Sequence, residues 1–475
     1  MKPSDTVTGL ALAAAFLLAG GMLYAFVPEL WGAEMLRLLI VGGIAMGAYR
    51  LLCPATKAGY LVLLGAWALL AVGFSLNLWW FTSANGGTVT EPVLLNYDAS
   101  VIWMQFTALH DGIALPCGLE QIGYASFLDK LFFLTSPRID NIMIFSTLST
   151  MLAIVFSGAA AARAVCSNAC RRRMCTMAMG LMTAVCYFLA SGSLIIKDAF
   201  ECMTMAVAAW GAVTLGKASR FNAGAWIALA LVVFASWATR PYQLVYIALL
   251  MALIAIPAWR ENKWRVGLLA VLIALCGVLL LNKFDSGITT PVLPVTDDQE
   301  HFYIGDNASS RLAAFNTVTG NIYDLSLWQR LVKLPFFAAV QFFAPLPWAF
   351  ARDTVFGPSQ AWAHVSYPWY AVAGLFLFFL LFCLRRAPKM LVLMAIFYCT
   401  AFLATAYVTG GTVARYCLPW LPFLTPCAAW PVVAGEWRTR TFRIYAICYA
   451  AAVAAGLAVI FTMLNIYSPG GWEAA

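Results

Sequence analysis

The residues best suited to chemistry in this chain of 475 residues are charged side chains beside long apolar stretches. An ionisable group next to hydrocarbon is costly and usually has a partner or a function. Asp98, preceded by Tyr97, opens an amphipathic segment that ends at His110, Asp111 and Gly112. This spacing predicts a helix with Asp98 as its N-cap and Gly112 at its end. The alternative is that Asp98 is a general base that accepts a proton from a hydroxyl group.

A second group lies at a predicted turn between two apolar stretches. Lys197 and Asp198 follow Ser191-Gly192-Ser193, and Glu201 comes one helical turn later. The Lys197 ammonium could hold a phosphate that Asp198 helps to orient. A lysine that extends to the interface and pairs with Glu201 explains the same spacing.

Two single arginines stand at span ends on the side of the membrane that the charge distribution, described below, predicts to be extracytoplasmic. Arg240 precedes Pro241, and Arg415 precedes Tyr416 after a pair of glycines. Basic residues are scarce on that side, so each arginine needs an anionic partner. The partner is either a carboxylate of the chain or a ligand phosphate, which the planar guanidinium fits well.

Metal and disulfide sites are not predicted. The first part of the second long loop holds an acidic group with one histidine: Asp285, Asp297, Asp298, Glu300, His301 and Asp306. Their spacing matches no calcium-binding loop, so we expect a solvated acidic segment. Of the thirteen cysteines, only Cys117 and Cys417 fall outside the membrane on that side. Two free thiols are favoured over a disulfide between them, because pairing cannot be deduced from sequence.

The composition predicts an integral membrane protein. Hydrophobic residues make up 63% of the chain and charged residues 11%, and the mean hydropathy is +0.83. These values exclude a soluble enzyme, a nucleic-acid reader and a fibrous protein. Apolar runs long enough to cross a bilayer recur along the chain, which predicts an all-α polytopic protein of about 13 transmembrane helices. The predicted spans cover residues 8–27, 34–52, 59–81, 140–162, 174–193, 198–216, 223–239, 242–258, 266–283, 366–384, 390–408, 418–435 and 443–466.

The distribution of charge predicts the orientation. With the N-terminus in the cytoplasm, the cytoplasmic segments hold 18 of the 29 Lys and Arg residues but only three of the 21 Asp and Glu residues. This asymmetry follows the positive-inside rule. Counting residues 331–350 as a further span would place the later basic loops on the extracytoplasmic side. These residues contain Pro335, Pro345 and Pro347, so we expect an interfacial or re-entrant helix.

Three regions follow from this pattern. Residues 1–283 form an N-terminal transmembrane bundle that includes an outer loop at 82–139. Residues 284–365 form a second outer loop that contains the 331–350 helix, and residues 366–475 form the C-terminal transmembrane helices. Neither loop is large enough for an independent catalytic domain of usual size. Any chemistry is therefore expected where the loops meet the bundle, in a multi-pass protein of the cell (inner) membrane with an extracytoplasmic active site.

The order of short motifs resembles the GT-C superfamily of integral membrane glycosyltransferases. These motifs are an Asp98-Ala99 that opens an amphipathic helix, Ile196-Lys197-Asp198 after Ser-Gly-Ser, Arg240-Pro241, Pro345-Leu346-Pro347-Trp348, and a late segment from Ala414 to Phe423 that reads Ala-Arg-Tyr-Cys-Leu-Pro-Trp-Leu-Pro-Phe. The chain is most similar to the bacterial protein mannosyltransferase and lipid A aminoarabinose transferase group. The resemblance covers most of the chain through motifs that are short and degenerate.

The resemblance implies an inverting transfer of a sugar from a polyprenyl-phosphate donor to a hydroxyl of a glycan, lipid or protein acceptor on the extracytoplasmic side, as in glycan biosynthesis for the cell envelope. It implies that Asp98 is catalytic and that Lys197, Arg240 and Arg415 bind the donor phosphate. The neighbouring residues with a candidate supporting role are Tyr97, His110, Asp111, Asp198 and Tyr416. The family often has paired acids in the first loop, whereas Asp98 here follows a tyrosine. No cofactor is required by this scheme, and dependence on a divalent cation is left open.

Two other functions fit a membrane protein of this kind. A polysaccharide polymerase or ligase would use the same lipid-linked substrate, but a more basic second loop is expected of it. A transporter or flippase for lipid-linked oligosaccharides needs polar groups deep in the spans. Apart from Arg37, the charges of this chain lie at or near predicted span ends, which favours chemistry at the membrane surface. Membrane lipids are expected partners, and nucleic acids are not.

Overall fold

The computed structural model of the chain describes residues 3–93, 97–113, 122–185, 192, 194, 197–217, 222–261, 263–285, 325–343, 374–377, 379–380, 382–383, 385–409 and 414–467. Every regular element in this part of the chain is a helix, with no strand. The helices of the first half are α1 (Pro3–Phe26), η1 (Pro28–Leu30), α2 (Trp31–Leu52), α3 (Lys57–Phe81), η2 (Ser83–Asn85), α4 (Tyr97–His110), α5 (Ile122–Leu131), α6 (Ile139–Ala164), α7 (Asn168–Thr183) and α9 (Asp198–Lys217). Those of the second half are α10 (Ala223–Thr239), α11 (Gln243–Glu261), α12 (Lys263–Asp285), α15 (Leu327–Phe343), α18 (Lys389–Thr409), η6 (Ala414–Trp420), α19 (Leu421–Val433), η7 (Glu436–Arg438) and α20 (Arg440–Tyr467).

Seven of the described helices are long and apolar enough to cross a membrane, and three shorter helices are also apolar. The prediction of an all-α membrane protein is therefore confirmed, while the number of thirteen spans stays a prediction. Polar residues cap the starts of three helices: the side chains of Thr56, Ser167 and Asn222 accept backbone hydrogen bonds at the starts of α3, α7 and α10. Such caps satisfy N–H groups that the first helical turn leaves without a partner.

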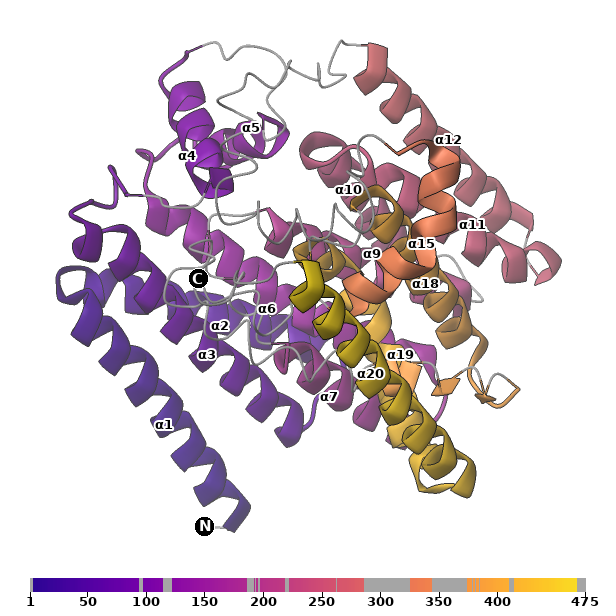
Figure 1. Cartoon of the computed structure of the whole chain (residues 1–475). Helices are drawn as coiled ribbons and strands as arrows, with labels where there is room; N and C mark the ends of the chain where they lie inside the picture. The colour runs from indigo at the N-terminus through magenta and orange to yellow at the C-terminus, as the bar shows by residue number, and fades with distance from the viewer. Residues whose placement is uncertain are drawn as a thin grey trace.

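Helices α6 and α9 form the centre of the bundle. In their spanning stretches 72% and 83% of residues are buried, against 17% in both α1 and α12. Small side chains allow this close packing, including Ala159–Ala162 of α6 and the pair Ala208 and Ala209 of α9, all of them buried. Figure 1 shows α1 at one edge of the molecule and α12 at the other.

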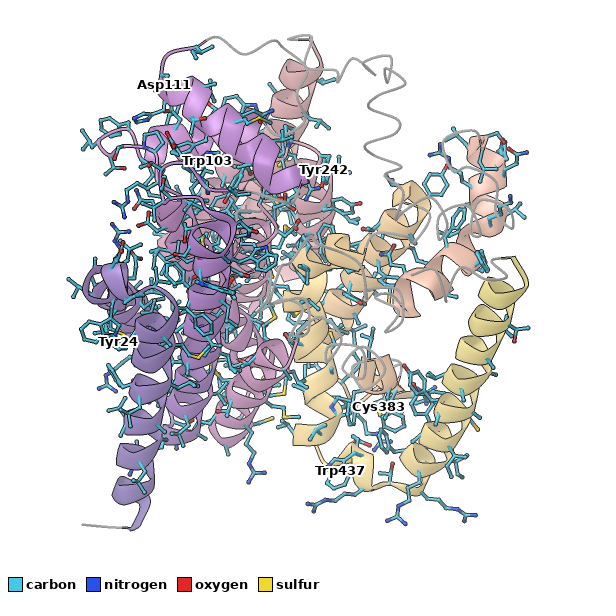
Figure 2. The ribbon with its side chains drawn as sticks, turned by 60° about the vertical axis from the view of Figure 1, so that its left-hand side comes forward. Tyr24, Trp103, Asp111, Tyr242, Cys383 and Trp437 are labelled. Carbon is cyan, nitrogen blue, oxygen red and sulfur yellow. The ribbon has the colours of Figure 1, made fainter. Side chains whose placement is uncertain are left out.

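The bundle has two distinct ends. Helices α4 and α5 lie over one end, where Figure 2 also shows Trp103, Asp111 and Tyr242, and we call it the α5 end. Cys383 and Trp437 lie at the opposite end, which we call the Trp437 end. The N-terminus also lies away from α4 and α5 (Figure 1). The helices of the first long loop, α4 and α5, therefore lie at the opposite end of the bundle from the segments that contain Cys383 and Trp437.

The helix expected at residues 331–350 is observed as α15, Leu327–Phe343, and residues 344–350 lie outside the described part. It is not among the helices long and apolar enough to cross a membrane. One side packs against α18: the Tyr407 hydroxyl donates to the Leu327 carbonyl at 3.3 Å, and the Gln341 amide donates to the Phe402 carbonyl at 3.4 Å. Trp328 and Val332 are exposed. This two-sided character is typical of an interfacial helix.

Candidate functional site

A buried ionic cluster occupies the junction of α9 and α10. The Arg240 Nη1 donates a hydrogen bond to Glu201 Oε2 and lies 3.8 Å from Asp198 Oδ1. The side chains of Arg240, Glu201 and Asp198 are only 8%, 1% and 3% exposed. The guanidinium carbon also lies 4.7 Å from the centre of the Tyr242 ring, a cation–π distance. The cluster therefore holds a guanidinium in one orientation with little access to water.

Local structure explains why these residues meet. Asp198 and Glu201 belong to the first turn of α9, where residues three apart share a face and carboxylates are favoured by the helix dipole. Arg240 follows the last residue of α10, and its backbone N–H donates to the Ser236 carbonyl at 2.7 Å. The corner between α10 and α11 is closed by a hydrogen bond from the Ser236 hydroxyl to the Gln243 amide oxygen at 3.3 Å.

Lys197 precedes α9 directly and is half-buried beside this cluster. Its carbonyl accepts the Glu201 backbone N–H at 2.9 Å. The Glu201 carboxylate, which the sequence offered as a partner for Lys197, forms its ion pair with Arg240, 39 residues further along the chain. The acidic partner expected for Arg240 thus comes from the start of a span rather than from a long loop.

Helix α5 packs on the end of α10 beside the cluster. A Cβ atom added to Gly123 would lie 2.6 Å from the Ala238 carbonyl oxygen, so the two backbones are in close contact. The neighbouring Tyr124 is fully buried, and burial, with added effects of the Glu201 and Asp198 charges, raises the pKa of its phenol above the usual range. The first long loop is therefore docked where Arg240 leaves its helix.

Helix α4 carries the candidate base. The helix starts at Tyr97, two residues earlier than an N-cap at Asp98 requires, so Asp98 lies inside its first turn. The predicted end is confirmed, because Gly112 follows the helix with a φ of +72°, which favours glycine. The side chains of Tyr97 and Asp98 lie outside the described part.

The supporting residues at the other end of α4 are near α5. His110 Nδ1 lies 3.4 Å from Asp129 Oδ1, whereas Asp111 is exposed. Asp129 did not stand out in the sequence, because it is an ordinary acidic residue of a short amphipathic helix. Its contact with His110 links α4 to α5.

Arg415 and Tyr416 belong to η6, which packs against α9, but their side chains lie outside the described part. The structure thus brings the backbone of η6 to the helix that carries Asp198 and Glu201. Cys417 is buried, and its sulfur accepts a hydrogen bond from the Gln341 amide at 2.8 Å. Cys117 lies outside the described residues, as do the acidic residues between 286 and 306.

A second ionic cluster, which the sequence did not predict, joins α2 to α6. Arg37 Nη1 lies 3.1 Å from both Glu34 Oε1 and Asp140 Oδ2. Arg138 also binds Asp140, through its Nε and Nη2 atoms. The pair at Glu34 and Arg37 has helical spacing and could have been found, but the contact with Asp140 joins residues 103 apart. The deepest predicted cation is thereby neutralised.

No group of three or more metal-binding side chains occurs among the residues that the structure describes. His301 and His364 lie outside them. Comparisons with protein-family models, with curated proteins and with solved structures find no match for this chain.

Proposed function

We propose that this membrane protein is a glycosyltransferase that moves a sugar from a polyprenyl-phosphate donor to a hydroxyl acceptor at the extracytoplasmic surface. The supporting observation is the buried Arg240 cluster at the bundle end that α5 covers. The isoprenoid tail of such a donor stays in lipid while its phosphate sits at headgroup height, so the enzyme needs cations at a span end. Arg240 and Lys197 lie at the start of α9, and the η6 segment that carries Arg415 packs against the same helix.

In the proposed inverting displacement, the acceptor oxygen bonds to the anomeric carbon as the bond from that carbon to the phosphate oxygen breaks. The acceptor proton passes to Asp98, and the polyprenyl phosphate leaves with the bonding electrons. The negative charge of the phosphate therefore grows during the step, and nearby cations lower the barrier. Glu201 and Asp198 position the Arg240 guanidinium for this task.

The second ionic cluster supports surface chemistry over transport. Arg37 is the cation deepest in a predicted span, and it is paired with Glu34 and Asp140, which stand in the first turns of α2 and α6. A transport site near the membrane midplane would need polar groups further from the helix ends. A polymerase or ligase shares the lipid-linked donor and is distinguished by its acceptor.

The test is a transfer assay with purified protein in nanodiscs, a panel of polyprenyl-phosphate sugars and candidate acceptors, with products identified by mass. We expect Asp98→Asn to lower turnover by about 100-fold or more, the range for loss of a general base. Glu91→Gln changes an exposed acidic residue of the same outer loop that has no role in the proposed site, so it is the matched control and should leave turnover unchanged. Full turnover of Asp98→Asn would remove Asp98 as the base. Passage of intact donor across the bilayer without sugar transfer would show that the protein is a transporter and not a glycosyltransferase.

Donor binding gives a separate test. We expect Arg240→Ala and Arg415→Ala to weaken binding of the polyprenyl-phosphate donor, measured by equilibrium binding of labelled lipid. Unchanged donor affinity in both variants would assign the two arginines to structural pairing alone.

A further inference from the structure

Six exposed cations gather at the Trp437 end, on two segments that are far apart in the sequence. We call them the basic patch: Arg385, Arg386, Lys389, Arg438, Arg440 and Arg443. The two segments are joined where Arg386 Nη1 contacts the Glu436 carboxylate at 2.9 and 3.1 Å. Figure 2 shows blue nitrogen atoms around Trp437 at this end of the ribbon.

The charge of the basic patch is largely uncompensated. Glu436 is the sole acidic residue between positions 385 and 443 of the sequence. Among the described residues, Arg386 is the one member of the patch that forms an ion pair. Six cations thus face one carboxylate, which leaves a strongly positive surface.

An apolar surface adjoins the patch on the side of the bilayer interior. The rings of Phe376 and Phe379 contact Phe442 at centroid distances of 5.5 and 4.8 Å, and Phe382 contacts Tyr445 at 5.2 Å. Phe382 and Ile447 remain exposed. Because a helix rises 1.5 Å per residue, Ile447 lies about 10 Å along α20 from Arg440.

Trp437 marks the height of the headgroups. Its ring is 42% exposed, and the Arg438 guanidinium lies 5.1 Å from the ring centre. Tryptophan is enriched at membrane–water interfaces, where its ring bridges apolar and polar surroundings. The cations therefore stand at the level of lipid phosphates, with the exposed apolar side chains at the level of acyl chains.

We infer that the basic patch binds the phosphate headgroup of an anionic phospholipid, whose acyl chains lie along α20 against Phe382 and Ile447. Charge complementarity carries this inference, together with the succession of Trp437 in η7, Arg440 and Arg443 at the start of α20, and the exposed Ile447 further along α20. It is independent of the proposed enzyme activity. A group of exposed basic residues without an adjoining exposed apolar surface does not provide such a site. Arg172 and Arg173 of α7 are also exposed, but none of the described residues of α7 is an exposed large apolar side chain.

The experiment compares two matched pairs of substitutions in the full chain. Binding of phosphatidylglycerol and of phosphatidylcholine is measured by native mass spectrometry after titration into detergent-solubilised protein. Arg440→Gln with Arg443→Gln should weaken phosphatidylglycerol binding by about 10-fold, because each cation near a membrane surface contributes to anionic-lipid binding. Arg172→Gln with Arg173→Gln removes the same charge elsewhere and should change binding less than twofold. Lysine at positions 440 and 443 should restore most of the affinity.

Four results would overturn the inference. Equal losses in both pairs would assign lipid binding to general positive charge, and no loss in either would remove the patch from lipid binding. Phosphatidylcholine bound as tightly as phosphatidylglycerol would exclude recognition of anionic lipid. Displacement of the lipid by millimolar inorganic phosphate would indicate a free-phosphate site. If the α20 pair fails to fold, the unmodified protein decides the matter: phosphatidylglycerol binding that does not fall as salt is raised contradicts the inference.

Discussion

Arg240 shows what a buried charge contributes at the scale of a single residue. Removing charges from water costs several kcal/mol for each ion, and attraction between them only partly repays that cost. The Arg240 cluster is therefore weak as a source of stability but well suited to fix a guanidinium in place. Its two carboxylates come from one turn of α9, so a shift of α10 against α9 would disturb both contacts.

We expect Arg240→Met to lower the free energy of unfolding by about 3–5 kcal/mol, because Glu201 and Asp198 lose their partner while buried. Adding Glu201→Gln to this variant should recover part of the loss, since one uncompensated charge is removed. Thermal unfolding in detergent measures both effects. Strictly additive losses in the double variant would contradict the coupling between the two side chains.

The second ionic cluster predicts unequal effects of its two acids. Asp140 contacts Arg37 and Arg138 and also accepts the Asn141 backbone N–H at 2.9 Å. Glu34 forms an ion pair with Arg37 and lies beside the Asp140 carboxylate. We therefore expect Asp140→Asn to reduce thermal stability more than Glu34→Gln does. A larger loss of thermal stability in Glu34→Gln than in Asp140→Asn would show that Glu34 contributes more to the stability of the cluster.

Helix α5 illustrates how an element sets the geometry of the site. Its close approach to α10 depends on the missing side chain of Gly123. The same short helix buries Tyr124 beside the cluster and contributes Asp129 to the contact with His110 of α4. The position of α4, and of Asp98 on it, therefore depends on how α5 is seated.

We expect Gly123→Ala to push α5 away from α10, at a cost of about 1–3 kcal/mol typical of overpacking. Limited proteolysis of the 82–139 loop should become faster, and sugar transfer should fall. Gly65→Ala in α3 is the matched control, because an added Cβ there meets no atom within 4 Å. Equal protease sensitivity in the two variants would mean that the close contact does not hold the loop.

Sequence patterns predicted local elements better than the contacts between them. Gly112 ends α4 as predicted, because a left-handed residue after a helix is a local requirement. Residues 331–343 of the segment expected to form an interfacial helix belong to α15, and the prolines and the charge balance that predicted this segment can be read from the sequence. The pairing of Glu201 with Arg240 could not be deduced, because two acids and one lysine compete for partners until the helices are packed.

At the scale of the whole molecule, the sequence predicted membrane insertion from composition, and the described helices agree with it. The distribution of Lys and Arg residues along the chain predicts that the Trp437 end faces the cytoplasm. The packing order could not be predicted from hydropathy, because α1 and α6 have the same mean hydropathy of 1.9, while 17% of the spanning stretch is buried in α1 and 72% in α6. That order depends on small side chains that fit against each other, and one sequence does not show which helices they join.

Orientation is directly measurable. In a cysteine-free background, we expect Asp111→Cys to react with a membrane-impermeant maleimide added outside intact cells. Trp437→Cys should react only after the membrane is opened, because the positive-inside rule places that end in the cytoplasm. Both positions are exposed, so accessibility depends on the side of the membrane. Labelling of position 437 in intact cells would reverse the topology and move the proposed site to the cytoplasm.

The extensive packing of α6 against α9 makes these two helices behave as one mechanical part. One ionic cluster is attached to α6 through Asp140 and the other to α9 through Asp198 and Glu201. A bulky side chain forced between α6 and α9 would tilt both helices and loosen both clusters together. A substitution within the contact between α6 and α9 would then disturb the alignment of the charged side chains at the helix ends.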